Sequence, residues 1–233
     1  MKNKQYYLTI PFIVIEFVFL ILVCFGITGK KINCFISILL CFLFSLIFIA
    51  KNPKVIILQV GLLFTVISDV FLVLLDAKIP EAGMSTFVVV QLSYWIYLLM
   101  NIKEHNRILD VAMRLLVIAA AEALVVCVIK DKFDYLSFIS ILYFANLILN
   151  IVVAFIKFKS NPYLAIGLLL FAFCDVIIGL SSANGYYIYI EENSIIDKMI
   201  HSRFDHAWFF YIPAQTLIAL SVKFEKEKGA EAP

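Results

Sequence analysis

The chain alternates long apolar runs with short polar connectors, and this pattern constrains its fold more than any other feature. A helix needs roughly 20 apolar residues to cross the hydrocarbon core of a bilayer. We expect eight transmembrane helices, at about residues 7–28, 32–50, 54–76, 83–101, 107–129, 134–158, 162–182 and 203–222. The sequence therefore predicts an all-α membrane protein that forms a single integral membrane domain over residues 1–233.

The composition supports a membrane protein and argues against a nucleic-acid partner. Apolar residues make up 64% of the chain and the mean hydropathy is +1.00, whereas soluble domains are about half apolar. The formal net charge is only +2, and the lysines are scattered between the apolar runs. This distribution fits short loops at a bilayer surface. The first apolar run is too long for a signal peptide, so we expect an uncleaved first helix.

An even number of crossings brings both ends of the chain to the same side of the membrane. With eight spans, eleven Lys and Arg residues lie on that side and seven on the other. The positive-inside rule then predicts cytoplasmic termini in a multi-pass protein of the cell membrane. Residues 223–233 are expected to form a short charged C-terminal tail.

Two apolar stretches repeat the same pattern, VGLLFTVISDVFLVL and IGLLLFAFCDVIIGL. Each places an aspartate eight residues after a glycine, at Gly61 and Asp69 and at Gly167 and Asp175. The two aspartates are 106 residues apart. The glycines are expected to allow close contact between helices.

The same offset relates two glutamates in other apolar runs, Glu16 and Glu122. We interpret this as a duplication, with one four-helix repeat at about 7–101 and a second at about 107–222. Four crossings per repeat make the repeats parallel, related by an axis along the membrane normal. The two aspartates would then lie at one depth and face each other across a central cavity.

Acidic side chains inside a membrane cost several kcal/mol, roughly, and usually serve a function. Two carboxyl groups close together in a low dielectric take up protons unequally, so that one is neutral and the other ionised. This is the arrangement that general acid and general base catalysis requires. Asp69 and Asp175 are therefore the predicted catalytic residues. Glu16 and Glu122 either serve the same site or bond to a neighbouring helix.

Further polar side chains share helix faces within the apolar runs. Gln91 and Tyr94 are three residues apart, and Tyr211 and Gln215 are four apart, so each pair lies on one face. These four side chains either line the cavity or pair helices. Arg114 is expected to extend toward the membrane surface.

The stretch HSRFDH at 201–206 contains two histidines, an arginine and an aspartate at a membrane edge. Its spacing matches no zinc pattern. It is instead expected to contact an anionic headgroup or to be solvated at the interface.

From about residue 32 onward, the chain resembles the YhhN-like family, the lysoplasmalogenases. Four pieces carry the resemblance: GLLFTVISDVFLVL, FVVVQLSYWIY, AIGLLLFAFCDVIIGL and FYIPAQTLIA. The positions that match the family pattern are Asp69, Tyr94, Gly167, Phe171, Asp175, Tyr211, Ala214 and Gln215. Three positions depart from it, because Ser68 replaces a glycine, Cys174 a serine and Gln91 a histidine.

The resemblance implies hydrolysis of the vinyl-ether bond of a lysophospholipid, with Asp69 and Asp175 as the catalytic pair. The substrate contacts would be Tyr94, Gln91, Tyr211, Gln215, Glu16 and Glu122. Protonation of the vinyl ether at carbon gives a cation that water attacks, which parallels the carboxylate pairs of glycosidases. This chemistry requires no cofactor or metal.

Three other classes of protein fit parts of the pattern. Parallel repeats with intramembrane acids also suit a proton-coupled transporter of a small solute, although short helices interrupted by Gly or Pro are missing. An intramembrane aspartyl protease would share the two aspartates, but the residues before them, VIS and AFC, lack a Gly-x-Gly. A receptor or assembly protein without catalytic chemistry is the third alternative.

Overall fold

The computed structural model describes residues 2–27, 29–48, 51–102 and 104–231. Nearly all of these residues are helical. The α-helices are α1 (Lys2–Cys24), α2 (Lys30–Leu46), α3 (Pro53–Asp69), α4 (Pro80–Leu99), α5 (Glu104–Ile129), α6 (Tyr135–Ile156), α7 (Pro162–Ala183), α8 (Ile195–Ile200) and α9 (His206–Glu231). A π-helical segment, η1 (Val70–Leu74), continues α3, and two 3₁₀ turns, η2 (Lys130–Lys132) and η3 (Phe158–Ser160), follow α5 and α6.

Within the described ranges, seven helices are long and apolar enough to cross a membrane, namely α1, α3 with η1, α4, α5, α6, α7 and α9. Helix α2 has 17 residues, at the lower limit for a span, and it packs against α1, α3 and α9. It ends at Leu46, before the predicted limit, and residues 49–50 lie outside the described residues. The chain is thus an all-α multi-pass membrane protein, as the apolar runs predict.

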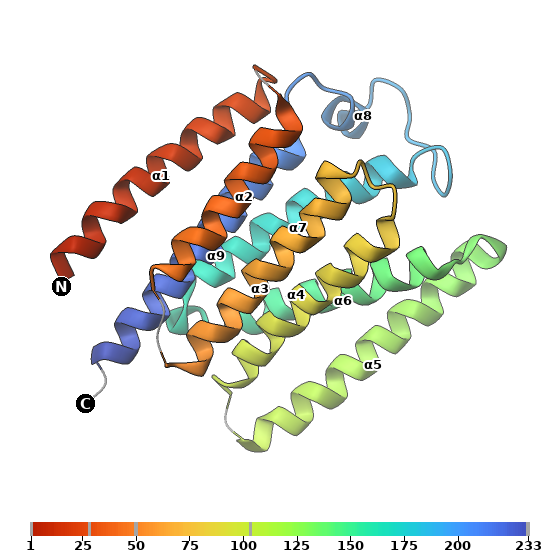
Figure 1. Ribbon diagram of the computed structural model, residues 1–233. Coiled ribbons are helices and arrows are strands. Elements are labelled where there is room, and N and C mark those ends of the chain that lie inside the picture. Colours follow the sequence, from red (N-terminus) through yellow and green to blue (C-terminus); the bar gives the residue numbers. More distant parts are fainter. Residues whose placement is uncertain (1, 28, 49–50, 103, 232–233) are drawn as a thin grey trace.

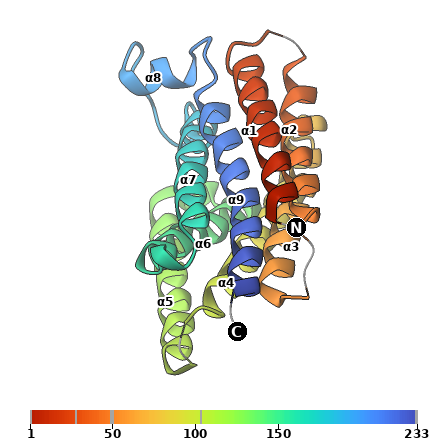
Figure 2. The same ribbon diagram turned by 90° about the vertical axis from the view of Figure 1, so that its left-hand side faces the viewer.

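The long helices form one bundle in which successive helices run up and down (Figure 1). Helices α1 and α5 lie at opposite edges, and α3, α4, α7 and α9 lie between them. The start of α1 and the end of α9 lie at the same end of the bundle, with α8 at the other end (Figure 2). Helix α5 packs mainly on α6 and is largely exposed along its length, which is expected of a helix in contact with lipid.

Packing partners recur along the chain in the order expected of a duplication. Helix α3 packs on α4 as α7 packs on α9, and α1 packs on α2 as α5 packs on α6. The two helices that carry the aspartates also begin alike: an asparagine caps the first turn and a proline follows it, at Asn52 and at Asn161. Both residues suit a helix start. The repeat itself stays a prediction.

Two glycines allow their helices to approach closely, as predicted. A Cβ atom at Gly61 would lie 2.5 Å from Cε1 of Tyr94 on α4. A Cβ atom at Gly167 would lie 2.9 Å from Cγ1 of Ile218 and 3.1 Å from the carbonyl oxygen of Ala214, both on α9. Each glycine therefore belongs to the contact between an aspartate-bearing helix and the helix that follows it in its half of the chain.

Two segments differ from the expected pattern. The loop 183–202 contains the short helix α8, which Ser194 caps by accepting a hydrogen bond from the Asp197 backbone N–H. The last helix continues through the residues that were predicted to form a charged tail and ends at Glu231. It continues because Glu225 is buried against neighbouring helices instead of being solvated.

Candidate functional site

Asp69, the last residue of α3, is held by a tyrosine from the opposite end of the chain. The Tyr211 hydroxyl on α9 lies 3.1 and 2.9 Å from the two carboxylate oxygens of Asp69. Asp69 is 2% exposed and Tyr211 is 5% exposed. The carboxylate is therefore shielded from solvent and bound by a neutral donor rather than by a cation.

Asp175, in the second half of α7, has the same kind of partner. The hydroxyl of Tyr143 on α6 donates to its Oδ2 atom. Tyr143 is buried, and Asp175 is half-buried. The two predicted catalytic residues thus each bind one tyrosine hydroxyl, but Asp175 is the more accessible carboxylate.

An aromatic side chain connects the two aspartate–tyrosine pairs. The centroid of the Phe171 ring is 5.3 Å from that of Tyr211 and 6.4 Å from that of Tyr143. Phe87 on α4 packs on Phe171 at 5.6 Å and on Tyr143 at 5.5 Å. The tyrosine partners of the two predicted acids therefore pack against the same phenylalanine ring, that of Phe171.

Local backbone structure distinguishes the two aspartates. Helix α3 changes to π geometry directly after Asp69, where the Leu75 N–H bonds to the carbonyl of Val70, five residues earlier. Such π segments are rare in proteins, and those that occur are often found at functional sites. The hydroxyl of Ser68 donates to the carbonyl of Gly83 on α4 at 2.6 Å. Ser68, which stands where the family pattern has glycine, therefore ties α3 to α4 beside Asp69.

Two buried amide side chains have unsatisfied hydrogen-bonding groups. Gln215 lies one turn after Tyr211 on α9, is fully buried, and neither end of its amide has a hydrogen-bond partner among the described residues. Gln91 on α4 accepts a hydrogen bond from Asn150 at 2.9 Å, but its Nε2 atom has no such partner. Buried polar groups normally have partners, so these amides are suited to bind a ligand or an internal water.

The other predicted contacts lie in different surroundings. Tyr94 is buried against Gly61. Glu16 on α1 is 2% exposed and accepts a 2.5 Å hydrogen bond from the Ser37 hydroxyl on α2. Glu122 on α5 is half-buried, and neither of its carboxylate oxygens has a partner among the described residues. The two glutamates, which the offset relates, thus have different environments.

Contrary to the prediction, Arg114 does not extend to the membrane surface. It is 2% exposed and pairs with Asp110 at 3.4 Å while its guanidinium lies over the ring of Trp95 on α4, 4.8 Å from the centroid. It also donates to the side-chain oxygens of Asn146 and Asn150 on α6, at 3.3 and 2.9 Å. Asp110 on α5, the Trp95 ring on α4 and the two asparagines on α6 keep this cation inside the protein. Through Asn150, the network reaches Gln91.

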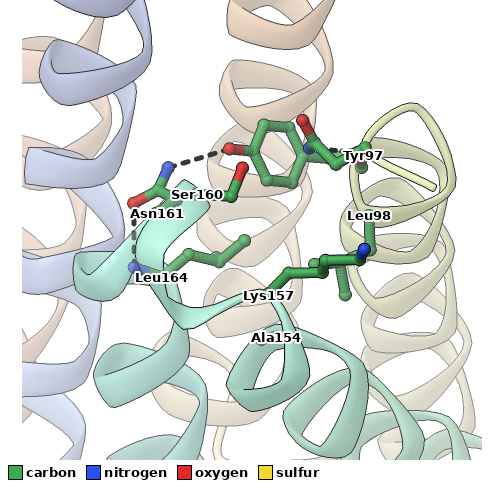
Figure 3. Close-up of a pocket in the computed structure, with 8 residues that line it drawn as sticks. Tyr97, Leu98, Ala154, Lys157, Ser160, Asn161 and Leu164 are labelled. Carbon is green, nitrogen blue, oxygen red and sulfur yellow. Dashed lines mark hydrogen bonds between the residues drawn. The ribbon is translucent and has the colours of Figure 1, made fainter.

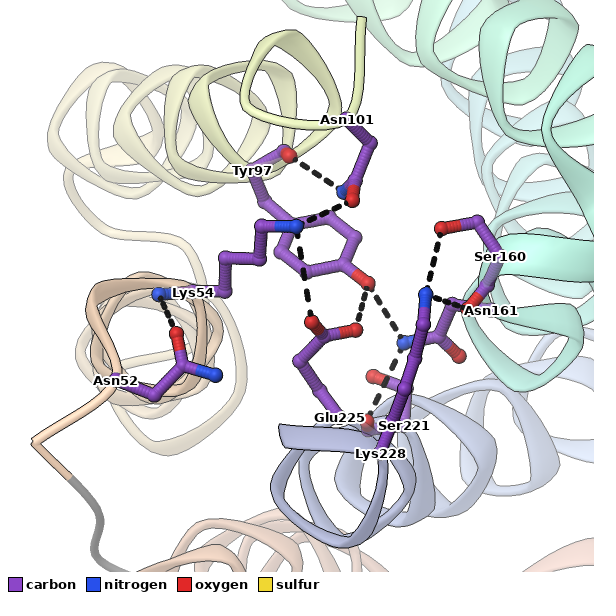
Figure 4. Close-up of polar contacts among 9 residues, drawn as sticks. All are labelled: Asn52, Lys54, Tyr97, Asn101, Ser160, Asn161, Ser221, Glu225 and Lys228. Atoms are coloured by element: carbon purple, nitrogen blue, oxygen red, sulfur yellow. Dashed lines mark hydrogen bonds and ion pairs between the residues drawn. The ribbon is translucent and has the colours of Figure 1, made fainter. Parts of the chain in front are cut away.

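A separate polar cluster joins the start of α3, the end of α4, the start of α7 and the last turns of α9 (Figure 4). Glu225 on α9 accepts a 2.7 Å hydrogen bond from the Tyr97 hydroxyl on α4, and Lys54 on α3 lies 3.9 Å from its other oxygen. Asn161 of α7 donates to the Tyr97 hydroxyl oxygen at 3.0 Å. Beside the cluster is a cavity of about 10 Å³ (Figure 3), large enough for about one water molecule.

Sequence reasoning missed Tyr143, the partner of Asp175. A signal for it exists, because Tyr143 lies 106 residues after Ser37, the partner of Glu16, and one turn before Asn146. The 106-residue offset relates the two sequence positions, but it does not predict their hydrogen bonds. Ser37 binds a glutamate on the preceding helix, whereas Tyr143 binds an aspartate on the following helix. In the described part of the chain, no group of three or more His, Cys, Asp or Glu side chains is arranged to hold a metal ion.

The fold and the site define a class: a multi-pass helical membrane protein with a pair of tyrosine-bound aspartates between its helices. The chain matches the model of the YhhN family over residues 31–222, and it therefore belongs to that family. No curated protein and no solved structure matches it. Family membership confirms the resemblance that the repeated stretches carry.

Proposed function

We propose that this protein is a lysoplasmalogenase-like hydrolase that cleaves the vinyl-ether bond of a lysophospholipid. The observation that supports this most is the pair of aspartates, each bound by one tyrosine hydroxyl and joined through Phe171. Membership of the YhhN family supports the same function at the level of the family. In this proposal, Asp69 and Asp175 are the acid and the base, and either one is able to act as the proton donor.

The reaction needs a proton at carbon and a water molecule. One aspartate in its neutral form donates a proton to the vinyl carbon remote from oxygen, which leaves an oxocarbenium-like cation. The other, as carboxylate, stabilises that cation and accepts a proton from the attacking water. The resulting hemiacetal breaks down to a fatty aldehyde and a glycerophosphodiester, in which the hydroxyl that carried the vinyl ether is free. Overall, one water is consumed and one carbon–oxygen bond is cleaved.

Two features of the surroundings suit this chemistry. A carboxylate that is bound by a neutral phenol, and that forms no ion pair among the described residues, is not locked in its ionised form, so it is able to exchange a proton. The unpaired amides of Gln91 and Gln215 provide donors and an acceptor for the polar part of a substrate or for the attacking water. We assign Tyr94, Tyr211, Glu16 and Glu122 to substrate contacts as part of the same proposal.

The test uses the purified protein in mixed micelles with a 1-alkenyl lysophospholipid, and it measures the release of fatty aldehyde. We expect Asp69→Asn and Asp175→Asn each to lower the rate by roughly 10²- to 10⁴-fold, since a carboxamide is unable to transfer the proton. Asp131→Asn, at an exposed position of η2, is the matched control and should keep the rate. Full hydrolysis by both folded site variants would contradict the proposal.

The rival function, proton-coupled transport, gives a different result. A transporter would release no aldehyde, but in proteoliposomes it would move protons together with a solute, and both aspartate variants would stop this movement. The proposed orientation, with cytoplasmic termini in the cell membrane, is tested by labelling single cysteines at the two ends in intact cells.

A further inference from the structure

A polar groove lies at the α8 end of the bundle, outside the aspartate site. It has a volume of about 310 Å³ and is formed by the last turns of α7, the segment 199–208 and the start of α2. The segment is fixed to the end of α1, because the Asp205 N–H bonds to the Cys24 carbonyl oxygen at 3.2 Å. The groove is therefore formed by the ends of α2, α7, α8 and α9, and it is bonded to the end of α1.

The charges of this groove leave one unpaired cation. Lys30 forms an ion pair with Asp205, and Asp205 also caps α9 by accepting from the Trp208 N–H at 3.1 Å. His206 is bound through Nδ1 to the Met199 carbonyl oxygen at 3.1 Å. Arg203 lines the groove and has no ion-pair or hydrogen-bond partner among the described residues. With Lys30 and Asp205 neutralising each other, the net charge of the lining is about that of Arg203.

Hydroxyl groups and the shape of the guanidinium favour an oxygen anion. Ser181 and Ser182 contribute hydroxyls from the end of α7. A guanidinium binds phosphate oxygens with two parallel hydrogen bonds, which gives both affinity and orientation. A single positive charge matches a phosphodiester, which carries one negative charge.

The groove is also next to the aspartates and to the lipid-facing surface. Its lining includes Trp208, whose ring packs on Tyr211 with centroids 5.0 Å apart, and Tyr211 binds Asp69. Along α7, Ser181 lies six residues beyond Asp175, roughly 9 Å of helix. Ile178, which lines the groove, is 49% exposed. The path of seven bonds from the vinyl carbon through the glycerol to the phosphorus atom is of comparable length to the step from Ser181 to Asp175.

We propose that this groove binds the phosphodiester of a lysophospholipid through Arg203 and so directs the ether end of the glycerol toward the aspartates. This inference rests on the proposed function for its substrate, but it concerns binding and is tested without catalysis. The probe is a 1-alkyl-ether lysophospholipid, which has the phosphate but no vinyl ether to cleave. The comparison ligand is the 1-alkylglycerol that lacks the phosphate.

Affinities are measured by calorimetry with the full-length protein in detergent micelles. We expect the phosphate-bearing lipid to bind at least about tenfold more tightly than the alkylglycerol, and Arg203→Gln to remove most of that difference. Arg203→Lys should keep part of it, because it retains charge without the paired hydrogen bonds. Lys198→Gln, an exposed cation of α8 that is not part of the groove lining, is the control and should change neither affinity.

The outcomes separate this inference from the proposed function. Equal affinities for both ligands, or an Arg203→Gln variant that binds like the native chain, would overturn the inference even if aldehyde release is observed. Conversely, Arg203-dependent binding without any aldehyde release would refute the hydrolase and leave the groove as a lysophospholipid site. Binding of inorganic phosphate as tightly as the lipid probe would show a site for free phosphate and would also overturn the inference.

Discussion

The Tyr211 hydroxyl on α9 donates to both carboxylate oxygens of Asp69 on α3, across 142 residues of sequence. This bond joins the two halves of the chain at the less exposed of the two aspartates. Tyr211→Phe removes the donor and keeps the ring, so it should leave a buried carboxylate unsatisfied. We expect a loss of about 1–3 kcal/mol in unfolding free energy and a markedly lower rate of vinyl-ether hydrolysis.

Thermal unfolding in micelles and the aldehyde assay measure these two effects. Tyr163→Phe is the matched control, because Tyr163 is 38% exposed at the start of α7, and it should behave like the native chain. Native stability and rate in Tyr211→Phe would mean that the bond to Asp69 contributes neither to folding nor to the reaction.

The glycine contacts predict opposite effects of the same substitution at different positions. Gly61→Ala would place a methyl group 2.5 Å from Tyr94, and overpacking of this kind costs about 1–3 kcal/mol. Gly179→Ala, on α7, meets nothing within 4 Å, and alanine is favoured over glycine inside a helix by roughly 1 kcal/mol. Melting temperatures should therefore fall for the first variant and rise slightly for the second. Equal shifts would refute the close α3–α4 contact.

The buried Arg114 is expected to hold α5 to the bundle. Arg114→Leu leaves the Asp110 carboxylate without its cation, although Trp95 Nε1 still donates to it. Removing one partner of a fully buried ion pair costs about 3–5 kcal/mol, and we expect a smaller loss here because the Asp110 side chain is 13% exposed. Met113→Ala, next to it but 50% exposed, should cost far less. Limited proteolysis of the connector at 130–134, compared between the two variants, measures detachment of α5. Equal cleavage rates would show that Arg114 is not needed for this attachment.

The end cluster is tested by a double-mutant cycle on Tyr97 and Glu225. Their 2.7 Å bond links α4 to α9 in a buried position, and hydrogen bonds to charged groups contribute about 1.5–3 kcal/mol. Tyr97→Phe, Glu225→Gln and the combined variant are compared by urea unfolding in micelles. A coupling energy of about 1 kcal/mol or more is expected, whereas strictly additive effects would show that the bond is not formed in solution.

Much of the fold could be predicted from hydropathy because a bilayer permits few alternatives to helices. The pairing of side chains could not, since it depends on which helix faces which. The repeated stretches indicate Asp69 and Asp175, but nothing in them indicates that the partners are Tyr211 and Tyr143. Arg114 was mispredicted for the same reason: its position in α5 suggests the interface, whereas Asn146 and Asn150 on α6 supply buried partners.

Helix ends were harder to predict than helix positions. The charged residues after 222 resemble a solvated tail. In the structure, Glu225 contacts Tyr97 and Lys54, and Lys228 donates to Ser160, which explains why α9 continues. The π segment after Asp69 has no recognisable signal in VFLVL, a run that is equally compatible with an α-helix.

Because of the π segment, Asp69 and Asp175 lie in different kinds of helical backbone. Asp175 lies inside α7, an α-helix that continues for eight residues to Ala183. Asp69 lies where the backbone changes from α-helical to π-helical hydrogen bonding. A return of residues 70–74 to α-helical hydrogen bonding would rotate the chain that follows Asp69 and leave Asp175 in place. The two similar stretches thus place one acid inside a continuous helix and the other at a change of helical register.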